Sequence, residues 1–340
     1  MKTVFAVAVA CAAALMAPTA HAWWDNGHML VGQVASELMD KADVATIEQV
    51  LDSWEKDFPN TNKIATAAVW PDLIKCSKKT SSCNTPLFPS LSQMGEWHFV
   101  DLPINVDGSD WNGHAADLDL FKASLGGEAM DILEKSFLTM NTTKSLWAAN
   151  LVLRNFIHVF GDIHQPMHSV SGISQYTPTG DAGGNAWVFP QGCAFSNLHM
   201  VWDAAGGAYS QNNWMPEIKF MDKLKKNATE LIGLLPSQTD ELNFEQYSSL
   251  SDKAFIAAMD KSKALRYVVL DTYSYAQTIV YPALDLTMVN KTVPCPPDWY
   301  FSWASQIAKM RIATAGKRLS VILTQFARQI RQLGLVSNNA

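Results

Sequence analysis

Apolar residues recur at three- and four-residue steps through the last long segment of the chain, residues 300–334. This spacing places side chains on one face of an α-helix, and that face must be buried against other elements. Gly316 is the weak member of the stripe because it has no side chain to bury. The segment predicts a long amphipathic helix whose buried face holds Trp303, Ile307, Met310, Ala313, Gly316, Leu319, Ile322, Phe326 and Ile330.

Similar periodicity extends over most of the chain, whereas strand-like alternation is short and rare, limited to "WHFVDL" (97–102) and "AWVFP" (186–190). The turn-rich residues 171–193 predict one long loop, of a length that is often functional. The sequence shows no repeat and no linker rich in Pro, Gly or Ser. We therefore expect an all-α fold, with residues 23–340 as a single mainly helical domain. Further helices are predicted over 28–40, 43–56, 64–75, 116–136, 144–164, 217–234 and 252–283.

The first 22 residues have the form of a signal peptide. Lys2 precedes an apolar run over 4–16, and Ala20-His21-Ala22 matches the small-x-small cleavage pattern. The run is too short to span a bilayer, and no later stretch is uncharged and mainly apolar for about 18 residues. We expect residues 1–22 to be removed and the mature chain to be released as a monomer without a membrane span. It would be secreted, or periplasmic in a Gram-negative bacterium.

The cysteine count is compatible with disulfide bonds in an oxidising compartment. Of five cysteines, Cys11 would leave with the signal peptide, and an even number would remain. Cys76 and Cys83 would close a short loop, in which case Cys193 would pair with Cys295. The sequence leaves three pairings open. A zinc site built on cysteine is disfavoured because no C-x-x-C pair occurs.

Charge excludes a generic nucleic-acid-binding surface, because the formal net charge is −6 at pH 7. If the substrate carries phosphate, something other than a lysine- and arginine-rich face must attract it. Three sequons have the form of glycosylation acceptors and would be used only in a host that glycosylates secreted proteins. They begin at Asn141, Asn227 and Asn290.

Two His/Asp pairs four residues apart are the strongest chemical signal. His158 and Asp162 form one pair, and His199 and Asp203 form the other. On a helix, residues i and i+4 lie one above the other, so each pair can close on one ion. A single such pair is commonly a surface ion pair, but His168 lies between these two, after the helix-ending proline of "GDIHQPMH". Imidazole and carboxylate without thiolate suit catalytic zinc that keeps open positions.

Several motifs together resemble one known family. They are Trp23 followed by His28, "AVWPD", "WHF", "H-x-x-G-D-x-H-Q-P-x-H", "GGN" and "NLHxxWD". In this order and over residues 23–203, the pattern is similar to that of the zinc-dependent single-strand nucleases of moulds and plants, a family that includes protozoan 3′-nucleotidase/nucleases. The resemblance implies a helical domain with a tri-zinc cleft, a fold shared with zinc-dependent phospholipase C. Beyond residue 203, the likeness is limited to helical character.

The resemblance also implies a ligand set for three Zn²⁺ ions. One would be held by Asp72, His98, His158 and Asp162, and a second by His168, His199 and Asp203. The third would take His28, a bridging oxygen of Asp162, and the α-amine and carbonyl of Trp23. Removal of the signal peptide would therefore create a ligand by exposing the amine of Trp23.

The implied reaction is hydrolysis of single-stranded DNA and RNA to 5′-phosphorylated products, with release of phosphate from 3′-mononucleotides as well. Asp72 would orient the nucleophile. Lys75, one turn later, and Asn185, in the glycine-rich loop, would contact phosphate; their ordinary alternatives are a surface lysine and a turn residue. Phe99 would stack on a base and Asp101 would accept from its edge, although Phe99 would also suit a core.

Two other functions remain open at this point. A zinc-dependent phospholipase C would share the tri-zinc arrangement and the terminal tryptophan, but it carries glutamate where this chain has Asp203. A catalytically silent, zinc-stabilised binding protein is the second alternative. Phosphate release from a single strand or a 3′-nucleotide, with and without a chelator, separates the three.

Overall fold

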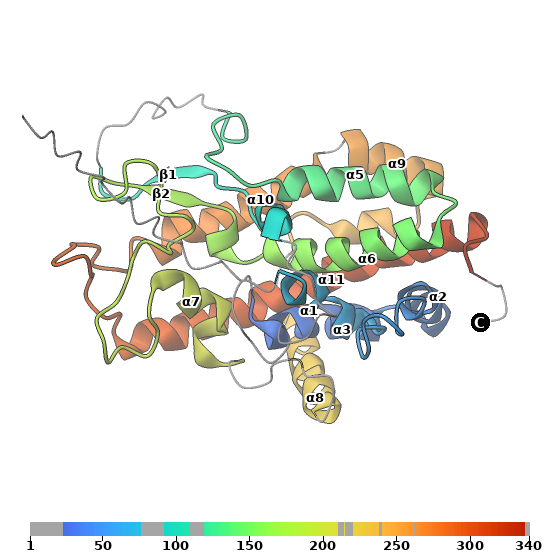
Figure 1. Cartoon of the computed structure of the whole chain (residues 1–340), viewed down its shortest axis with the longest axis horizontal. Coiled ribbons are helices and arrows are strands. Elements are labelled where there is room, and N and C mark those ends of the chain that lie inside the picture. The colour runs from blue at the N-terminus through green and yellow to red at the C-terminus, as the bar shows by residue number, and fades with distance from the viewer. Residues whose placement is uncertain are drawn as a thin grey trace, which may run out of the picture.

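The long periodic segment forms α11 (Asp298–Gln332), which runs through the middle of the molecule in the computed structural model (Figure 1). Its 35 residues extend about 52 Å at a rise of 1.5 Å per residue. The structure describes residues 23–75, 92–108, 119–209, 214, 220–237, 240–261 and 263–336. The predicted mainly helical architecture is confirmed for these residues.

The close approach of α1 (Asp25–Leu38) to α11 explains the glycine in the apolar stripe. A Cβ atom at Gly316 would lie 2.5 Å from Cγ1 of Val34, so a larger residue would force the two helices apart. A Cβ atom at Gly32, on α1, would lie 2.8 Å from Cα of Ala65. These contacts fix α1, the helix that carries His28, between α11 and the segment around Ala65.

The remaining helices surround this pair. In Figure 1, α5 and α9 lie side by side above α6, while α8 extends away from the bundle below α1. Most buried apolar residues, from Trp23 to Ile330, form one large cluster, and Trp54, Trp70 and Ile74 form a second, small one. The other α-helices are α2 (Lys41–Asp52), α3 (Ile64–Ala67), α4 (Trp70–Leu73), α5 (Ala129–Thr142), α6 (Leu146–Asp162), α7 (Leu198–Asp203), α8 (Met221–Ile232), α9 (Asp252–Lys261) and α10 (Ala264–Tyr275).

The prediction of one helix over 64–75 is wrong, because α3 and α4 are separate short helices. Pro71 lies in the first turn of α4, where its missing N–H leaves no helical hydrogen bond to lose. The break removes the carbonyl of Ala68 from a continuous helix, and that carbonyl instead lies 2.5 Å from Nδ1 of His158.

The helix predicted over 116–136 instead begins at Ala129. Gly127 has φ +88°, and a Cβ atom there would lie 2.1 Å from the carbonyl oxygen of Phe99, so this turn requires glycine and ends before the helix begins. The segment 252–283 also divides, into α9, α10 and a π-helical turn (Ala276–Val280), with Lys263 in the left-handed region before α10.

Both predicted strands are wrong. Residues 92–98 form a 3-10 helix, and 186–190 make only an isolated bridge from Val188 to Asn197. The strands that form are β1 (Pro103–Asn105) and β2 (Ser171–Ile173), paired in parallel with Pro103 opposite Ser171. The predicted long loop over 171–193 therefore begins with a short strand and continues as turns.

One predicted disulfide is present, between Cys193 and Cys295, whose Cα atoms are 5.8 Å apart. It ties the long loop to the segment before α11. Cys76 and Cys83 lie outside the described residues, as does the whole of 1–22. Among the residues described, no helix is long and apolar enough to cross a membrane. Asn141 and Asn290 are exposed and Asn227 is half-buried, and their glycosylation remains a prediction.

Candidate metal centre

Both predicted His/Asp pairs lie on helices, and both aspartates are the last helical residue. His158 and Asp162 are in the final turn of α6, and His199 and Asp203 are in α7, which Asn197 caps with its side chain. All four are buried. A helix C-terminus carries partial negative charge, so a buried carboxylate there is disfavoured unless a cation lies nearby. Both helix ends therefore favour a cation site.

The first group of candidate ligands joins α6 to the 3-10 helix that ends at His98. The nitrogen and oxygen atoms of His98, His158 and Asp162 lie within 4.8 Å of one another. Oδ2 of Asp162 is 3.1 Å from Nδ1 of His98 and 3.3 Å from Nε2 of His158. Oδ1 of Asp72 adds a second carboxylate, 3.8 Å from Nδ1 of His98 and 3.7 Å from Nε2 of His158.

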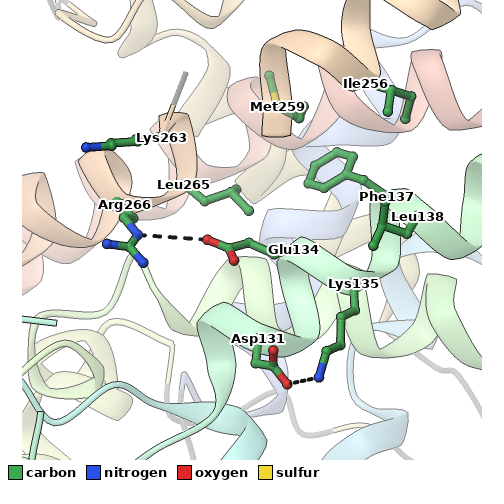
Figure 2. Close-up of a pocket in the computed structure, with 10 residues that line it drawn as sticks. All are labelled: Asp131, Glu134, Lys135, Phe137, Leu138, Ile256, Met259, Lys263, Leu265 and Arg266. Atoms are coloured by element: carbon green, nitrogen blue, oxygen red, sulfur yellow. Dashed lines mark hydrogen bonds and ion pairs between the residues drawn. The ribbon is translucent and has the colours of Figure 1, made fainter. Parts of the chain in front are cut away.

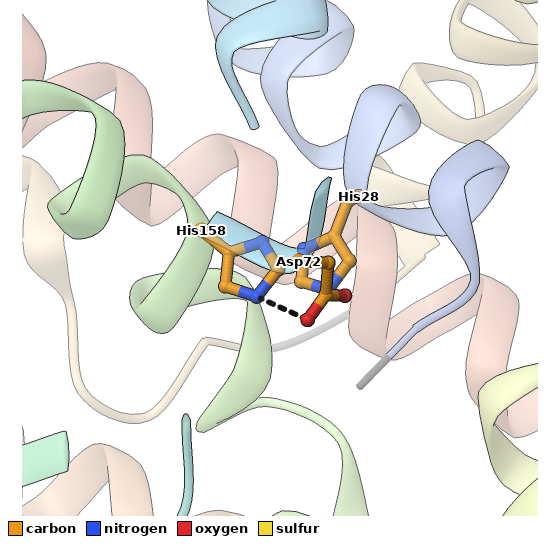
Figure 3. A group of neighbouring side chains, drawn as sticks. All are labelled: His28, Asp72 and His158. Carbon is orange, nitrogen blue, oxygen red and sulfur yellow. Dashed lines mark ion pairs between the residues drawn. The ribbon is translucent and has the colours of Figure 1, made fainter. Parts of the chain in front are cut away.

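A second group overlaps the first. His28, from α1, forms it with Asp72 and His158, and the three side chains converge in Figure 3. The rings of His28 and His158 stack with centroids 3.9 Å apart. Nε2 of His28 also lies 3.1 Å from Oδ1 of Asp162. Asp162 thus directs one oxygen toward His28 and the other toward His98, which is how a carboxylate bridges two ions.

The third group contains His168, His199 and Asp203. The Nε2 atoms of His168 and His199 are 3.2 Å apart, and Nε2 of His199 is 3.3 Å from Oδ2 of Asp203. The amide of Gln165 donates a 2.7 Å hydrogen bond to Oδ1 of Asp203 and fixes that carboxylate. Three groups of three or more potential ligands are therefore present among the described residues.

Backbone carbonyls orient three of the imidazoles. Nδ1 of His158 lies 2.5 Å from the oxygen of Ala68, Nδ1 of His168 lies 2.7 Å from that of His98, and Nδ1 of His199 lies 2.7 Å from that of Gly183. A proton on Nδ1 in each ring leaves Nε2 as the lone-pair donor, directed into its group. This is the orientation that histidine ligands of metals commonly have.

Burial sets the protonation states of these side chains. It lowers the pKa of His158 to about 4 and lowers the pKa values of His98 and His168 well below their usual range. Burial also raises the pKa of the Asp203 carboxyl, against the hydrogen bond from Gln165. Neutral imidazoles are the form that binds metal.

The start of the predicted mature chain lies against this centre. Trp23 is fully buried, and its indole N–H donates to the carbonyl of Gly161, next to Asp162, at 3.1 Å. A Cβ atom at Gly27 would lie 2.7 Å from Cβ of Trp23, so this turn is tight. Trp24 donates its backbone N–H to the carbonyl of Asp203, and its ring lies 6.4 Å from that of Phe195. The structure thus places Trp23 near both His28 and Asp162 in the fold.

The two predicted phosphate contacts lie at different edges of the centre. Nζ of Lys75 forms an ion pair with Oδ1 of Asp72 at 2.6 Å, and both side chains are largely buried. Asn185 is half-buried and donates its amide to the carbonyl of Ala182, while its oxygen accepts from Asn197, the cap of α7. Lys75 is therefore a buried partner of Asp72 rather than a surface lysine.

Phe99 and Asp101, the predicted base contacts, lie around the same glycine, Gly126. A Cβ atom at Gly126 would lie 3.7 Å from each of three side-chain atoms, Cε2 of Phe99, Oδ2 of Asp101 and Oε2 of Glu96. Phe99 is half-buried, so it is not a core residue. Burial, with Asp181 and Glu96 nearby, raises the pKa of Asp101 to about 7. The glycine leaves an aromatic edge and two carboxylates around the same point.

Sequence reasoning missed the residue that shapes the long loop. Asp181 is fully buried and accepts from the N–H groups of Gly172 and Gly184, the indole of Trp187 and the hydroxyl of Tyr281. The same loop supplies the Gly183 carbonyl that orients His199. An aspartate directly before "AGGN" was the available signal, and of its four donors only Tyr281 comes from a distant segment.

A cavity of about 430 Å³ lies apart from the candidate ligands, between α5, α9 and α10 (Figure 2). Figure 2 shows two ion pairs at its wall, Arg266 with Glu134 between α10 and α5, and Lys135 with Asp131 within α5. None of the described candidate metal ligands lines it. This cavity is therefore separate from the candidate metal centre.

Comparison with known proteins agrees with this centre. Residues 23–328 match the model of the S1/P1 Nuclease family. Nuclease S1 of Aspergillus oryzae (strain ATCC 42149 / RIB 40) is 24% identical over 207 residues, or 59% of this chain and 62% of its own length. Endonuclease 2 of Arabidopsis thaliana is 26% identical over 224 residues, or 63% of this chain and 66% of its own length.

The matched region therefore spans a little under two thirds of these relatives. The family match covers every candidate ligand, from Trp23 to Asp203, and continues through most of α11. The chain belongs to the S1/P1 nuclease family.

Proposed function

We propose that this chain is a metal-dependent phosphoesterase that hydrolyses single-stranded DNA and RNA to 5′-phosphorylated products and also acts on 3′-mononucleotides. The observation that carries the proposal is the set of three adjoining His/Asp groups, in which Asp162 faces His28 through one oxygen and His98 through the other. Membership of a nuclease family supports the same reaction class.

Three Zn²⁺ ions are the proposed cofactors. Neutral imidazoles and carboxylates without thiolate are a donor set that fits catalytic zinc. The first ion would be held by Asp72, His98, His158 and Asp162, the second by His168, His199 and Asp203, and the third by His28, Asp162 and the amine and carbonyl of Trp23. Bound zinc acts as a Lewis acid on the phosphoryl group and on the attacking water.

Three side chains around the metal groups would act on the attacking water and on the phosphate. Asp72 would orient the attacking water and take its proton, because its Oδ1 lies between His98 and His158. Lys75, already 2.6 Å from that oxygen, would neutralise a phosphate oxygen beside it. Asn185 would donate its amide to phosphate from the other edge.

Phe99 and Asp101, beside Gly126, would contact a base. Phe99 would stack on it while Asp101 pairs with its edge. A base must leave its duplex partner to stack on a side chain, so single strands should be preferred over duplex.

We further propose that residues 1–22 are removed after Ala22, that the mature enzyme is secreted, or periplasmic in a Gram-negative host, and that it is monomeric. Trp23 supports this proposal because its indole already anchors it beside Asp162. Cleavage would give it the free amine that the third ion requires. A Cys76–Cys83 disulfide and glycosylation at Asn141, Asn227 and Asn290 are part of the same proposal.

The experiment compares a single-stranded oligonucleotide, the same sequence as duplex, and 3′-AMP as substrates of the purified mature protein. We expect zinc analysis to give about three ions per chain, with faster cleavage of the single strand and phosphate release from 3′-AMP. A chelator should abolish both activities and lower the melting temperature, because metal bound to the folded state adds to its stability. An active enzyme with one zinc would contradict the tri-zinc assignment.

Including a phosphatidylcholine substrate tests the lipase alternative. The aspartate at position 203 and the family match both favour the nuclease. Hydrolysis of the lipid without cleavage of the strand would support the lipase. Zinc binding without turnover of any substrate would support the binding protein.

A further inference from the structure

Two arginines of α11 are buried beside His164, two residues after Asp162. Arg311 and Arg318 are seven residues apart, on the same face of the helix, and each side chain is 3% exposed. A guanidinium taken out of water requires charged partners and hydrogen bonds. The groups that bind these two guanidinium groups are therefore the ones that this face of α11 holds in place.

Arg311 makes three contacts on one side. It pairs with Oδ2 of Asp271 at 2.7 Å, contacts Oγ1 of Thr272 at 2.5 Å, and donates through Nε to the carbonyl of His164 at 3.2 Å. Thr272 in turn lies 2.6 Å from the carbonyl oxygen of Ile163. Two consecutive carbonyls, of Ile163 and His164, are thus held from α10 and α11.

Arg318 holds the side chain of the same histidine. It pairs with Asp240 at 2.7 Å and with Asp271 at 3.1 Å, and its NH1 lies 3.2 Å from Nε2 of His164. Arginine has no acceptor, so Nε2 accepts. Nδ1 of His164 therefore carries the proton and donates to the carbonyl of Phe160 at 2.8 Å. His164 is fully buried and belongs to none of the three metal groups.

Ile163 and His164 lie in the segment that connects two of the metal groups. They follow Asp162 directly and precede His168 by only a few residues. Asp162 belongs to the first group and His168 to the third, so this segment sets how the two groups lie relative to each other. Catalysis by adjacent metal ions depends on that spacing.

We propose that Arg311, Arg318 and Thr272 are positioning residues. They brace Ile163 and His164 so that the group containing Asp162 and the group containing His168 keep a working separation. This inference rests on the proposed metal-dependent function. It assigns a role in the reaction to the C-terminal helix, which supplies no ligand in the proposed set.

The same helix provides a control cluster. Arg331 pairs with Asp43 at 2.7 Å and contacts Oγ1 of Thr46 at 2.8 Å, although its side chain is 33% exposed. That cluster connects α11 to α2, which carries no candidate ligand. Thr46 and Thr272 are both buried, and each lies within 2.9 Å of the carbonyl oxygen four residues earlier.

The experiment uses two pairs of variants, Thr272→Val with Thr46→Val and Arg311→Met with Arg331→Met. Hydrogen exchange over residues 159–170 is measured on the metal-free proteins. Zinc release to a chromogenic chelator, kcat and KM on a single-stranded oligonucleotide, and melting temperature are measured on the zinc-loaded ones. The melting temperature reports general stability, whereas exchange over 159–170, zinc release and kcat report the positioning of the metal groups.

All four variants should melt at lower temperature than the unmodified protein. We expect only Thr272→Val and Arg311→Met to speed exchange over 159–170, to release zinc at least about tenfold faster and to lower kcat by at least about tenfold. KM should stay within about threefold. A tenfold loss of kcat corresponds to about 1.4 kcal/mol in the barrier.

The positioning role is wrong if Thr272→Val and Arg311→Met match their controls in exchange, zinc release and kcat. Should Arg311→Met fail to fold, the isosteric threonine pair decides by the same criteria. An unmodified protein that binds no zinc, or that binds zinc and cleaves no strand, contradicts the proposed function instead.

Discussion

Nε2 of His28 lies 3.1 Å from Oδ1 of Asp162, although the two residues are separated by more than a hundred positions in the chain. The other oxygen of Asp162 faces His98, so this carboxylate would be shared by two ions. We expect Asp162→Asn to lower the zinc content by about two ions per chain, because an amide is a poor bridging ligand. Asp203→Asn, at the end of α7, should lower the zinc content by only about one ion per chain.

Zinc analysis of both purified variants checks this difference. Equal loss of zinc from Asp162→Asn and Asp203→Asn would show that Asp162 does not bridge. The apparent melting temperature of Asp162→Asn should also be the lower of the two, since more bound metal is lost.

Asp72→Asn should remove turnover and leave the fold largely intact. The first group keeps His98, His158 and Asp162, but the attacking water loses the carboxylate that would take its proton. We expect kcat to fall by well over tenfold while the melting temperature changes little. Activity within about tenfold of the unmodified enzyme, roughly 1.4 kcal/mol of barrier, would exclude this role for Asp72.

Tyr281→Phe should destabilise the protein more than Tyr273→Phe does. The hydroxyl of Tyr281 donates to the buried carboxylate of Asp181 at 2.7 Å, whereas that of Tyr273 donates to the neutral carbonyl of Pro103 at 3.0 Å. Hydrogen bonds to charged groups contribute about 1.5–3 kcal/mol and neutral ones about 1 kcal/mol. Urea unfolding measures both free energies, and a Tyr281→Phe loss no larger than that of Tyr273→Phe would contradict the anchoring role of Asp181.

Asp101→Asn should have a pH-dependent effect on stability. Burial, with Asp181 and Glu96 nearby, raises the pKa of Asp101 to about 7, above the value near 3.9 of an unfolded chain. Between these values the folded state binds more protons than the unfolded state, so the contribution of Asp101 to stability falls as pH rises from about 4 to 7. The asparagine side chain does not ionise, so its contribution to stability does not change over this pH range.

The melting temperature of Asp101→Asn, minus that of the unmodified protein, should therefore increase over this pH range in the presence of chelator. Asp57→Asn, at an exposed position, controls for the loss of one negative charge. A difference that stays constant between pH 4 and 7 would contradict a raised pKa at Asp101.

A chain that begins Met-Trp23, with the methionine retained, should lose the third zinc and most activity. The extension turns the α-amine of Trp23 into an amide, a poor donor to zinc. Proteolytic exposure of Trp23 should restore both properties. Trp24→Phe should matter far less, because the side chain of Trp24 makes only packing contacts and its backbone hydrogen bond to Asp203 is kept. An extended enzyme with three zinc ions and full activity would refute this account.

Local sequence patterns were sufficient for some of the helices and for the spacing of the two His/Asp pairs. A 3.6-residue period and an i, i+4 spacing are properties of a single helix, so α6 and α11 were predictable without tertiary contacts, whereas α7 was not among the predicted helices. The Cys193–Cys295 pairing was one of three arrangements, and the structure contains it. The resemblance to a family supplied the remaining candidate ligands.

Only the tertiary structure decided how these pieces meet. The turn at Gly127 moved the start of α5 because the backbone of Phe99 lies against it, and no local pattern encodes that approach. The ion pair of Lys75 with Asp72, and the bracing of His164 by Arg311 and Arg318, depend equally on the packing of separate elements. A helix determines which of its own residues share a face, whereas the partner of a buried charge is determined by whichever distant segment the core brings beside it.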